Sequence, residues 1–391
     1  MLQSLGWMVL VGFVLAGLFQ KFKLPGLIGM MIAGMVLGPN GLNLLSDKIL
    51  LISPELRQIA LIVILLRAGL NLDLKDLKQI GRPAFLMSFI PAAFEILTIV
   101  LIAPLIFKIS VLEAALLGSV LAAVSPAVVV PRMIHLKQMN KGQKHKLPQM
   151  IMAAASVDDI FVIVLFTSFI GLLKGQTFDL NIFYELPLSL ITGIVCGFGF
   201  AYLFTALFKR IHIRDTIKVL VLFSLSFFLV GFESEIKALF PFSGLIAVMT
   251  LGMGIQAFYP VLVSRLLGKF AKIWVGAELF LFILVGAVVN LKLLTSITVI
   301  GLVVITVALL GRMIGVQLCL VKTPLNLKER LFTSIAFLPK ATVQAAIGSI
   351  AFSQGLAVGE LILSLAVLSI LFSAPLGAIG IDLSTNILLE E

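Results

Sequence analysis

Apolar runs of membrane-spanning length recur along almost the whole chain. Breaks at glycine, proline and charge clusters separate about thirteen such runs in the 391 residues. A water-soluble globular protein could not bury so many apolar segments in one core. With 60% hydrophobic and only 12% charged residues, the chain is predicted to be an all-α polytopic membrane protein with about 13 transmembrane helices.

The basic residues test this division. The predicted spans lie near residues 4–20, 25–45, 52–71, 83–107, 112–131, 147–173, 182–208, 216–232, 239–258, 273–290, 296–320, 331–352 and 359–378. With the N-terminus outside, the inside loops hold 20 of the 29 Lys and Arg residues, the outside segments hold 6, and 3 lie within spans. This alternation follows the positive-inside rule. It predicts an outside N-terminus and a cytoplasmic C-terminus, in what we expect to be a bacterial inner membrane. Topology and anionic lipid then explain the net charge of +10 without a nucleic-acid partner.

Two adjacent acids, Asp158 and Asp159, lie near the middle of the apolar run from Leu147 to Leu173, which contains no basic residue. Counted from Leu147, they are roughly 17 Å deep, close to the bilayer midplane. An aspartate there costs about 2.5–3.5 kcal/mol even on the lenient insertion scale, so an intramembrane acid is a functional residue by default. A carboxylate binds a small hard cation or a proton, and cannot do both fully at once. The pair is therefore predicted to be a shared site for a cation and a proton.

The two aspartates are not expected to play equal parts. Consecutive helical residues point about 100° apart, so only one carboxylate can face an ion squarely. We take Asp159 as the principal ligand and Asp158 as its modulator. Ser125, Ser156 and backbone carbonyls at a nearby helix break are predicted to complete the coordination. The two cysteines lie far apart in apolar runs, so no structural metal site is predicted, and no cofactor is expected.

Two predicted spans contain helix-breaking residues. The fifth contains Pro126 and Pro131, and the twelfth contains Pro339. Proline inside a helix frees backbone carbonyls, and discontinuous helices at matching places in two halves indicate an ion site at the midplane. Glu95 precedes Pro126 by 31 residues. Arg312 precedes Pro339 by 27, so spans four to six and eleven to thirteen are predicted to be inverted repeats. A simple proline kink is the alternative for each span taken alone.

Three further charges lie well inside predicted spans, away from the span ends. Glu95 and Arg312 are each expensive alone, so a buried ion pair between them is the cheapest arrangement. This pair is either structural or takes part directly in ion movement. Lys340 lies at the second break, where opposed helix ends expose carbonyls. It is expected either to stabilise those carbonyls or to tune the charge of the cavity.

Several motifs together resemble a known family. They are Leu24-Pro25-Gly26, Leu37-Gly38-Pro39, Arg67-Ala68-Gly69-Leu70, Ser125-Pro126-Ala127-Val128-Val129-Val130-Pro131 and Ser156-Val157-Asp158-Asp159. This set resembles the monovalent cation/proton antiporter superfamily, within it the sodium/proton antiporter branch related to the animal NHA exchangers. The similarity covers nearly the whole chain.

This resemblance implies an NhaA-like antiporter fold with two crossing discontinuous helices, in a homodimer whose subunit is one transmembrane unit. A core that moves like an elevator and a dimerisation scaffold are expected. The expected core helices are about 83–173 and 296–378, and the expected scaffold helices are about 1–71 and 182–290.

The implied activity is secondary active exchange of Na⁺ or Li⁺ for H⁺, serving pH homeostasis without a cofactor and without enzymatic chemistry. Asp158 and Asp159 would carry the competing ions, and Glu95 would pair with Arg312. Members with paired aspartates often place a lysine opposite the first of them. Here Arg312 occupies that region, which leaves the proton stoichiometry open.

The sequence is compatible with other transport activities besides Na⁺/H⁺ exchange. A potassium/proton antiporter on the same scaffold is the alternative, and a cation channel is a further one. An intramembrane aspartyl protease needs two aspartates from separate helices, which argues against it here. No glycine-rich phosphate-binding loop of the P-loop type is present, so ion gradients are the expected energy source.

Overall fold

The structure is a computed structural model that describes residues 1–72, 81–173, 182–211, 213–237 and 239–389. Within these ranges the regular structure is entirely helical, with no β-strand. The predicted all-α class is therefore confirmed.

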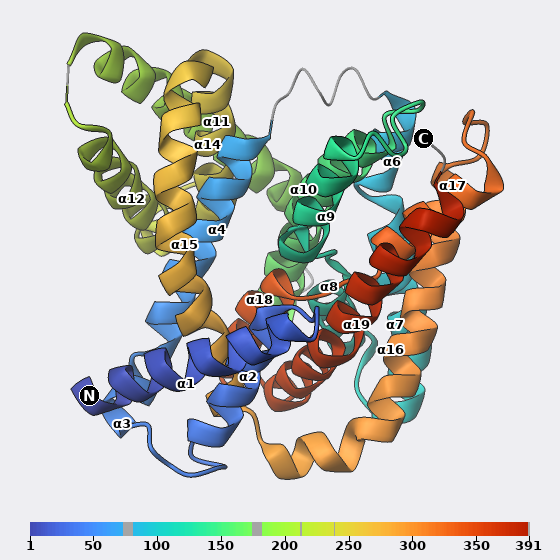
Figure 1. Cartoon of the computed structure of the whole chain (residues 1–391). Helices are drawn as coiled ribbons and strands as arrows, with labels where there is room; N and C mark the ends of the chain where they lie inside the picture. Colours follow the sequence, from blue (N-terminus) through green and yellow to red (C-terminus); the bar gives the residue numbers. More distant parts are fainter. Residues whose placement is uncertain (73–80, 174–181, 212, 238, 390–391) are drawn as a thin grey trace. The chain divides into compact units, whose positions relative to one another are not determined.

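The helices follow one another along the chain as shown in Figure 1. Their bounds are α1 Leu2–Lys21, α2 Gly26–Leu37, α3 Asp47–Leu51, α4 Ser53–Asn71, α6 Arg82–Met87, α7 Ile90–Phe107, α8 Val111–Ala122, α9 Pro126–Gln138, α10 Leu147–Leu173, α11 Ile182–Arg210, α12 Asp215–Gly231, α13 Glu233–Lys237, α14 Gly244–Phe258, α15 Pro260–Val288, α16 Leu291–Cys319, α17 Leu327–Ala336, α18 Thr342–Ser353 and α19 Gly359–Leu388.

Every predicted span overlaps at least one of these helices. In the described part of the chain, eight helical segments are long and apolar enough to cross a membrane. Three shorter apolar helices, α2, α14 and α18, accompany them. The total of thirteen spans stays a prediction.

The tenth predicted span, near 273–290, is too short. Helix α15 begins at Pro260. The charged residues near its start form contacts with polar side chains, so a helix can include them. Arg265 Nε lies 3.4 Å from Asp215. Lys269 Nζ donates to Thr216 Oγ1 at 3.0 Å. A charge cluster therefore marked the limit of the apolar run but not the limit of the helix.

By its contacts the chain divides into two compact units. The first comprises Met1–Pro54, Gln79–Lys174 and Leu279–Glu391, and the second comprises Glu55–Lys78 and Gly175–Glu278. The first unit includes both segments predicted as the core, together with α1, α2 and α3. The division into core and dimerisation helices stays a prediction. All residues of the site described below lie in the first unit.

The two interrupted helices of the first unit begin in the same way. The Ser110 side chain accepts a hydrogen bond from Glu113 N, and the Glu113 carboxylate accepts from Ser110 N in return. Asn326 and Glu329 form the same reciprocal pair at the start of α17. Such a capping box satisfies two otherwise unpaired amides. α8 and α17 are thus fixed at their N-termini and run towards the breaks.

A glycine allows α7 and α16 to approach closely. A Cβ atom added to Gly315 would lie 2.8 Å from Pro91 Cα, so any larger residue would push the helices apart. Arg312 is three residues before Gly315, and Glu95 is four residues after Pro91. Residues three or four apart share one helix face, so this contact brings the two charged side chains together.

Candidate ion-binding site

Both predicted helix interruptions are present in the structure. Pro126 is the first residue of α9, and three residues separate it from the end of α8. Pro339 lies between α17 and α18, in a non-helical stretch from 337 to 341. Pro131, however, was wrongly predicted to break the helix, because α9 continues to Gln138. A proline there removes one backbone hydrogen bond, and the helix continues around the gap.

The two breaks lie against each other. Ser125 N donates to Pro339 O at 2.8 Å. The Gln344 side-chain amide donates to Ala123 O at 2.5 Å, so each segment supplies a partner for a backbone group that the other break has freed. Unpaired backbone groups are costly in a membrane interior. The contacts between the breaks therefore hold the crossing in place.

Asp158 is anchored to this crossing. Its Oδ2 accepts a hydrogen bond from Val124 N at 2.8 Å, inside the first break. The same oxygen accepts from Arg312 Nη2 at 2.8 Å. Both side chains are fully buried. Asp158 therefore has a fixed charged partner and a backbone donor.

Glu95 lies between two cations. Its Oε2 is 2.9 Å from Arg312 Nη1 and 2.6 Å from Lys340 Nζ. The structure thus brings together Glu95 and Arg312, as expected from the sequence, and adds Lys340 to the pair. The two cations also donate to the Ala122 carbonyl at the C-terminal end of α8. Cations stabilise this negative end of a helix. Stabilising exposed carbonyls is one of the two roles predicted for Lys340.

Asp159 differs from its neighbour. It is only 4% exposed, and its Oδ1 has no hydrogen-bond partner among the described residues. No described side chain forms an ion pair with it. The hydroxyls of Ser125 and Thr342, one at the start of each helix that follows a break, are also buried without a partner. An isolated buried carboxylate is far more costly than a paired one, so Asp159 is the group that most needs a bound ion.

The charges of the cluster do not balance. Glu95, Asp158 and Asp159 supply three carboxylates, while Arg312 and Lys340 supply two cations. All five are buried. When every group is ionised, the cluster keeps one excess negative charge, which a single monovalent cation or one proton neutralises.

The sequence did not reveal every member of the site. The Lys340–Glu95 contact was not foreseen, and neither were Gln344 and Thr342. An available signal was that both polar residues lie within five residues after Pro339 in a mostly apolar run. The side chain of Ser156, which was predicted to assist coordination, lies outside the described part of the structure.

The two histidines that the structure describes, His135 and His145, form no hydrogen bond or ion pair with the charge cluster. His145 Nδ1 is 2.9 Å from Glu329 Oε1, which links the loop before α10 to the first turn of α17. His135 lines a small cavity of about 190 Å³ beside Arg132 and Asp382. His212 is outside the described residues.

Comparisons with known proteins give the family. The transmembrane sodium/hydrogen exchanger family matches residues 8–383. Sodium/hydrogen exchanger 9B2 of Homo sapiens is 36% identical over 389 residues, covering 94% of this chain and 70% of the relative. The orangutan Pongo abelii protein of the same name has the same identity and coverage. Human sodium/hydrogen exchanger 9B1 is 30% identical over 372 residues, covering 91% of this chain and 71% of the relative.

A solved structure shares the fold. The sodium proton antiporter MjNhaP1 of Methanocaldococcus jannaschii, determined at pH 8, superposes with a TM-score of 0.85 over 99% of both chains, at 20% identity. The antiporter fold expected from the sequence is therefore confirmed. On the match over nearly its whole length, this chain is an integral membrane protein that belongs to the sodium/hydrogen exchanger family.

Proposed function

We propose that this chain exchanges Na⁺ or Li⁺ for H⁺ across a membrane, with both ions competing for the carboxylates of Asp158 and Asp159. The observation that carries the proposal is the contrast between the two aspartates. Oδ1 of each aspartate is buried without a hydrogen-bond partner. Asp158, however, has Arg312 and a backbone amide as partners of its Oδ2, while buried Asp159 forms no ion pair with a described side chain. Asp159 can reach a neutral state only by taking up a cation or a proton. The names of the relatives support sodium as the cation.

The charge balance favours one-for-one exchange. With three carboxylates and two cations, one Na⁺ and one H⁺ leave the cluster with the same net charge. Arg312 stays protonated because a guanidinium does not release its proton in proteins, and it keeps Asp158 ionised. Asp158 then supplies fixed charge, and Asp159 carries the exchanged ion. The predicted exchange is therefore electrically silent.

An elevator-type motion of the core fits the contacts of the cluster. Arg312 of α16 connects Glu95 of α7 to Asp158 of α10, and Lys340 ties the second break to the same glutamate. Breaking a buried ion pair costs about 3–5 kcal/mol, so these elements are expected to move as one body. We propose that this body carries the site between the two sides of the membrane. The homodimer with scaffold helices, the inner-membrane location and the N-out, C-in orientation are proposed on the resemblance and on the distribution of basic residues.

Transport by the purified chain in proteoliposomes tests the activity. Na⁺, Li⁺ and K⁺ are offered separately under an imposed pH gradient, and dissipation of the gradient is recorded. We expect Na⁺ and Li⁺ to dissipate it and K⁺ to have little effect. Dissipation by K⁺ alone would instead assign a potassium/proton antiporter, and a conductance proportional to voltage would assign a channel. In the same assay Asp159→Asn should lose exchange. The matched control is Asp47→Asn, which changes an exposed aspartate of α3 and should retain wild-type exchange.

A further inference from the structure

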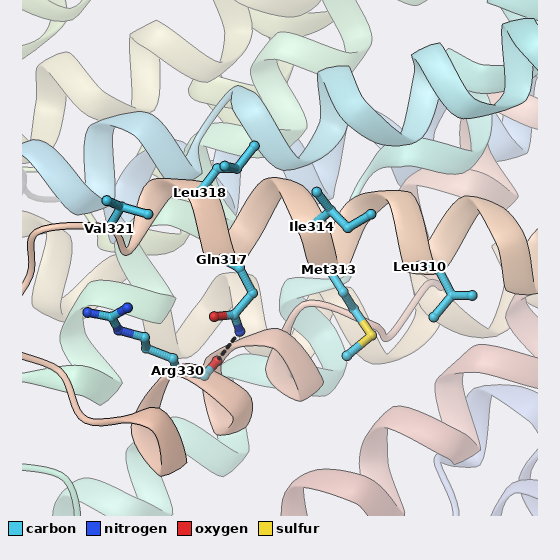
Figure 2. Close-up of a pocket in the computed structure, with 7 residues that line it drawn as sticks. All are labelled: Leu310, Met313, Ile314, Gln317, Leu318, Val321 and Arg330. Atoms are coloured by element: carbon cyan, nitrogen blue, oxygen red, sulfur yellow. Dashed lines mark hydrogen bonds between the residues drawn. The ribbon is translucent and has the colours of Figure 1, made fainter.

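A groove lies between α16 and α17 of the first unit, and no member of the charge cluster lines it. Its volume is about 570 Å³. Figure 2 shows aliphatic side chains of α16 along its length and Arg330 of α17 at one end. Leu310, Ile314 and Leu318 are 53%, 55% and 47% exposed. The groove is therefore an open apolar surface with a single cationic end.

The length of the groove matches one leaflet of a bilayer. Leu310, Ile314 and Leu318 are four residues apart, so they lie along one face of α16, and Val321 extends this line beyond the helix. From Leu310 to Val321 the rise is roughly 17 Å, against about 15 Å for half of the hydrocarbon core. The groove thus has the length of one lipid acyl chain.

Arg330 is held in place at the end of this line. Its Nε donates to Leu325 O at 3.0 Å, and its Nη2 lies 3.4 Å from Thr323 O. No carboxylate among the described residues forms an ion pair with it. The guanidinium has five N–H donors, so donors remain for a ligand at the groove.

The charges around Arg330 favour an anion. Lys322 and Lys328 are exposed in the same region. The nearby acid, Glu329, is already engaged, since its carboxylate accepts from Asn326 N at 2.9 Å and contacts His145 at 2.9 Å. The end of the apolar groove is therefore cationic, and guanidinium is the side chain best suited to bind phosphate.

We infer that this groove binds one anionic phospholipid, with an acyl chain along α16 and its phosphate on Arg330. The lipid would connect two helices that already share polar contacts. Gln317 Nε2 of α16 donates to Ser334 Oγ at 2.8 Å and to Arg330 O at 3.1 Å (Figure 2 shows the second contact). Because α16 carries Arg312 and α17 leads to Lys340, the bound lipid stabilises the elements that hold the charge cluster. The inference does not depend on which ion is exchanged.

Lipid binding to the delipidated full chain tests this directly. Phosphatidylglycerol or phosphatidylcholine is added in detergent, bound lipids are counted by native mass spectrometry, and thermal unfolding is followed in parallel. We expect phosphatidylglycerol to bind and to raise the melting temperature more than phosphatidylcholine does. Arg330→Gln should weaken phosphatidylglycerol binding about tenfold, the loss of roughly one charge-assisted contact. Arg210→Gln, which removes an exposed guanidinium at the end of α11, is the matched control and should bind as wild type does.

A second variant separates the groove from general surface charge. Ile314→Trp places a bulky ring on an exposed position of the groove and should lower phosphatidylglycerol occupancy while Arg330 is intact. Because the stabilisation by phosphatidylglycerol is compared with that by phosphatidylcholine within each variant, a lower baseline stability of Arg330→Gln does not affect that comparison. Equal stabilisation by both lipids, unchanged binding in Arg330→Gln, or the same stabilisation by inorganic phosphate alone would each overturn the inference.

Discussion

Arg312 Nη2 lies 2.8 Å from Asp158 Oδ2, and both side chains are fully buried. This contact makes two adjacent aspartates chemically different. Asp158 is neutralised by a permanent cation, while Asp159 has an unpartnered Oδ1 and no ion pair with a described side chain.

Asp159→Asn should abolish exchange without loss of thermal stability. The amide keeps the shape of the side chain but neither releases a proton nor neutralises a cation. It also removes an unpaired buried charge, so unfolding in detergent should occur at the same temperature or higher. Asp158→Asn should impair exchange strongly and destabilise the protein, because it breaks one of the two buried ion pairs of Arg312, at a cost of up to about 3–5 kcal/mol. Wild-type exchange by Asp159→Asn would refute the assignment of the site.

Glu95→Gln should lower thermal stability because it leaves two buried cations without their shared acceptor, again at about 3–5 kcal/mol. Adding Lys340→Gln removes one stranded cation and should recover part of the loss, with a coupling of about 0.5–3 kcal/mol. Adding Arg312→Gln instead should recover less, since Asp158 then loses its partner. Lys48→Gln, in an exposed position of α3, controls for a lysine change. Strictly additive losses for Glu95 and Lys340 would mean that the two side chains do not interact.

Gln344→Leu should destabilise the crossing of the two breaks. Gln344 donates to Ala123 O and accepts from Ala341 N at 2.9 Å, and leucine can do neither. Each buried group left unsatisfied costs about 1–3 kcal/mol. Gln354→Leu, at the exposed end of α18, makes the same change where no such bond is lost. Melting temperatures of the two variants in detergent should therefore differ, and equal values would argue against the crossing contacts.

Much of the site could be predicted because its members are locally conspicuous. A carboxylate pair or a proline inside an apolar run is costly wherever it occurs, so Asp158, Pro126 and Pro339 stand out in one sequence. The contact between Lys340 and Glu95 joins residues 245 positions apart. It depends on how two breaks cross, and no local pattern contains that information.

Helix limits were less predictable for a related reason. The charges near Arg265 marked the edge of the apolar run correctly, but α15 starts before them. Hydropathy reports the medium around a segment, while helix formation depends on backbone hydrogen bonds and side-chain partners. The division into core and dimerisation helices stays a prediction, because it concerns contacts with a second subunit, which no local sequence pattern describes.

The histidines are expected to leave the pH response of transport unchanged. Glutamine at positions 135, 145 and 212 keeps polar side chains and removes the capacity for positive charge near neutral pH. His145 contacts Glu329 but not the charge cluster, so its loss should not alter competition at Asp159. Activity recorded against pH for the triple glutamine variant checks this. A shifted profile would assign pH sensing to the loops.

Competition at one carboxylate gives the last prediction. If Na⁺ and H⁺ share Asp159, raising the proton concentration should raise the apparent KM for Na⁺ without lowering the maximal rate at saturating Na⁺. This holds until return of the proton-loaded site becomes limiting. At high pH the site binds Na⁺ readily, but few protons are available to bind it for the return step. Activity plotted against pH should therefore pass through a maximum.

Electrophysiology on a solid-supported membrane can follow the rise and the fall of activity on the two sides of this pH maximum. It also measures the net charge moved in each cycle. We expect no net charge movement, because Arg312 keeps its proton and Asp158 stays paired with it. A charge-moving signal would instead require a second proton and an ionising Asp158. An apparent KM for Na⁺ that stays constant between about pH 6 and about pH 8.5, a span over which a shared acid-base group should show competition, would contradict the shared site whatever the stoichiometry.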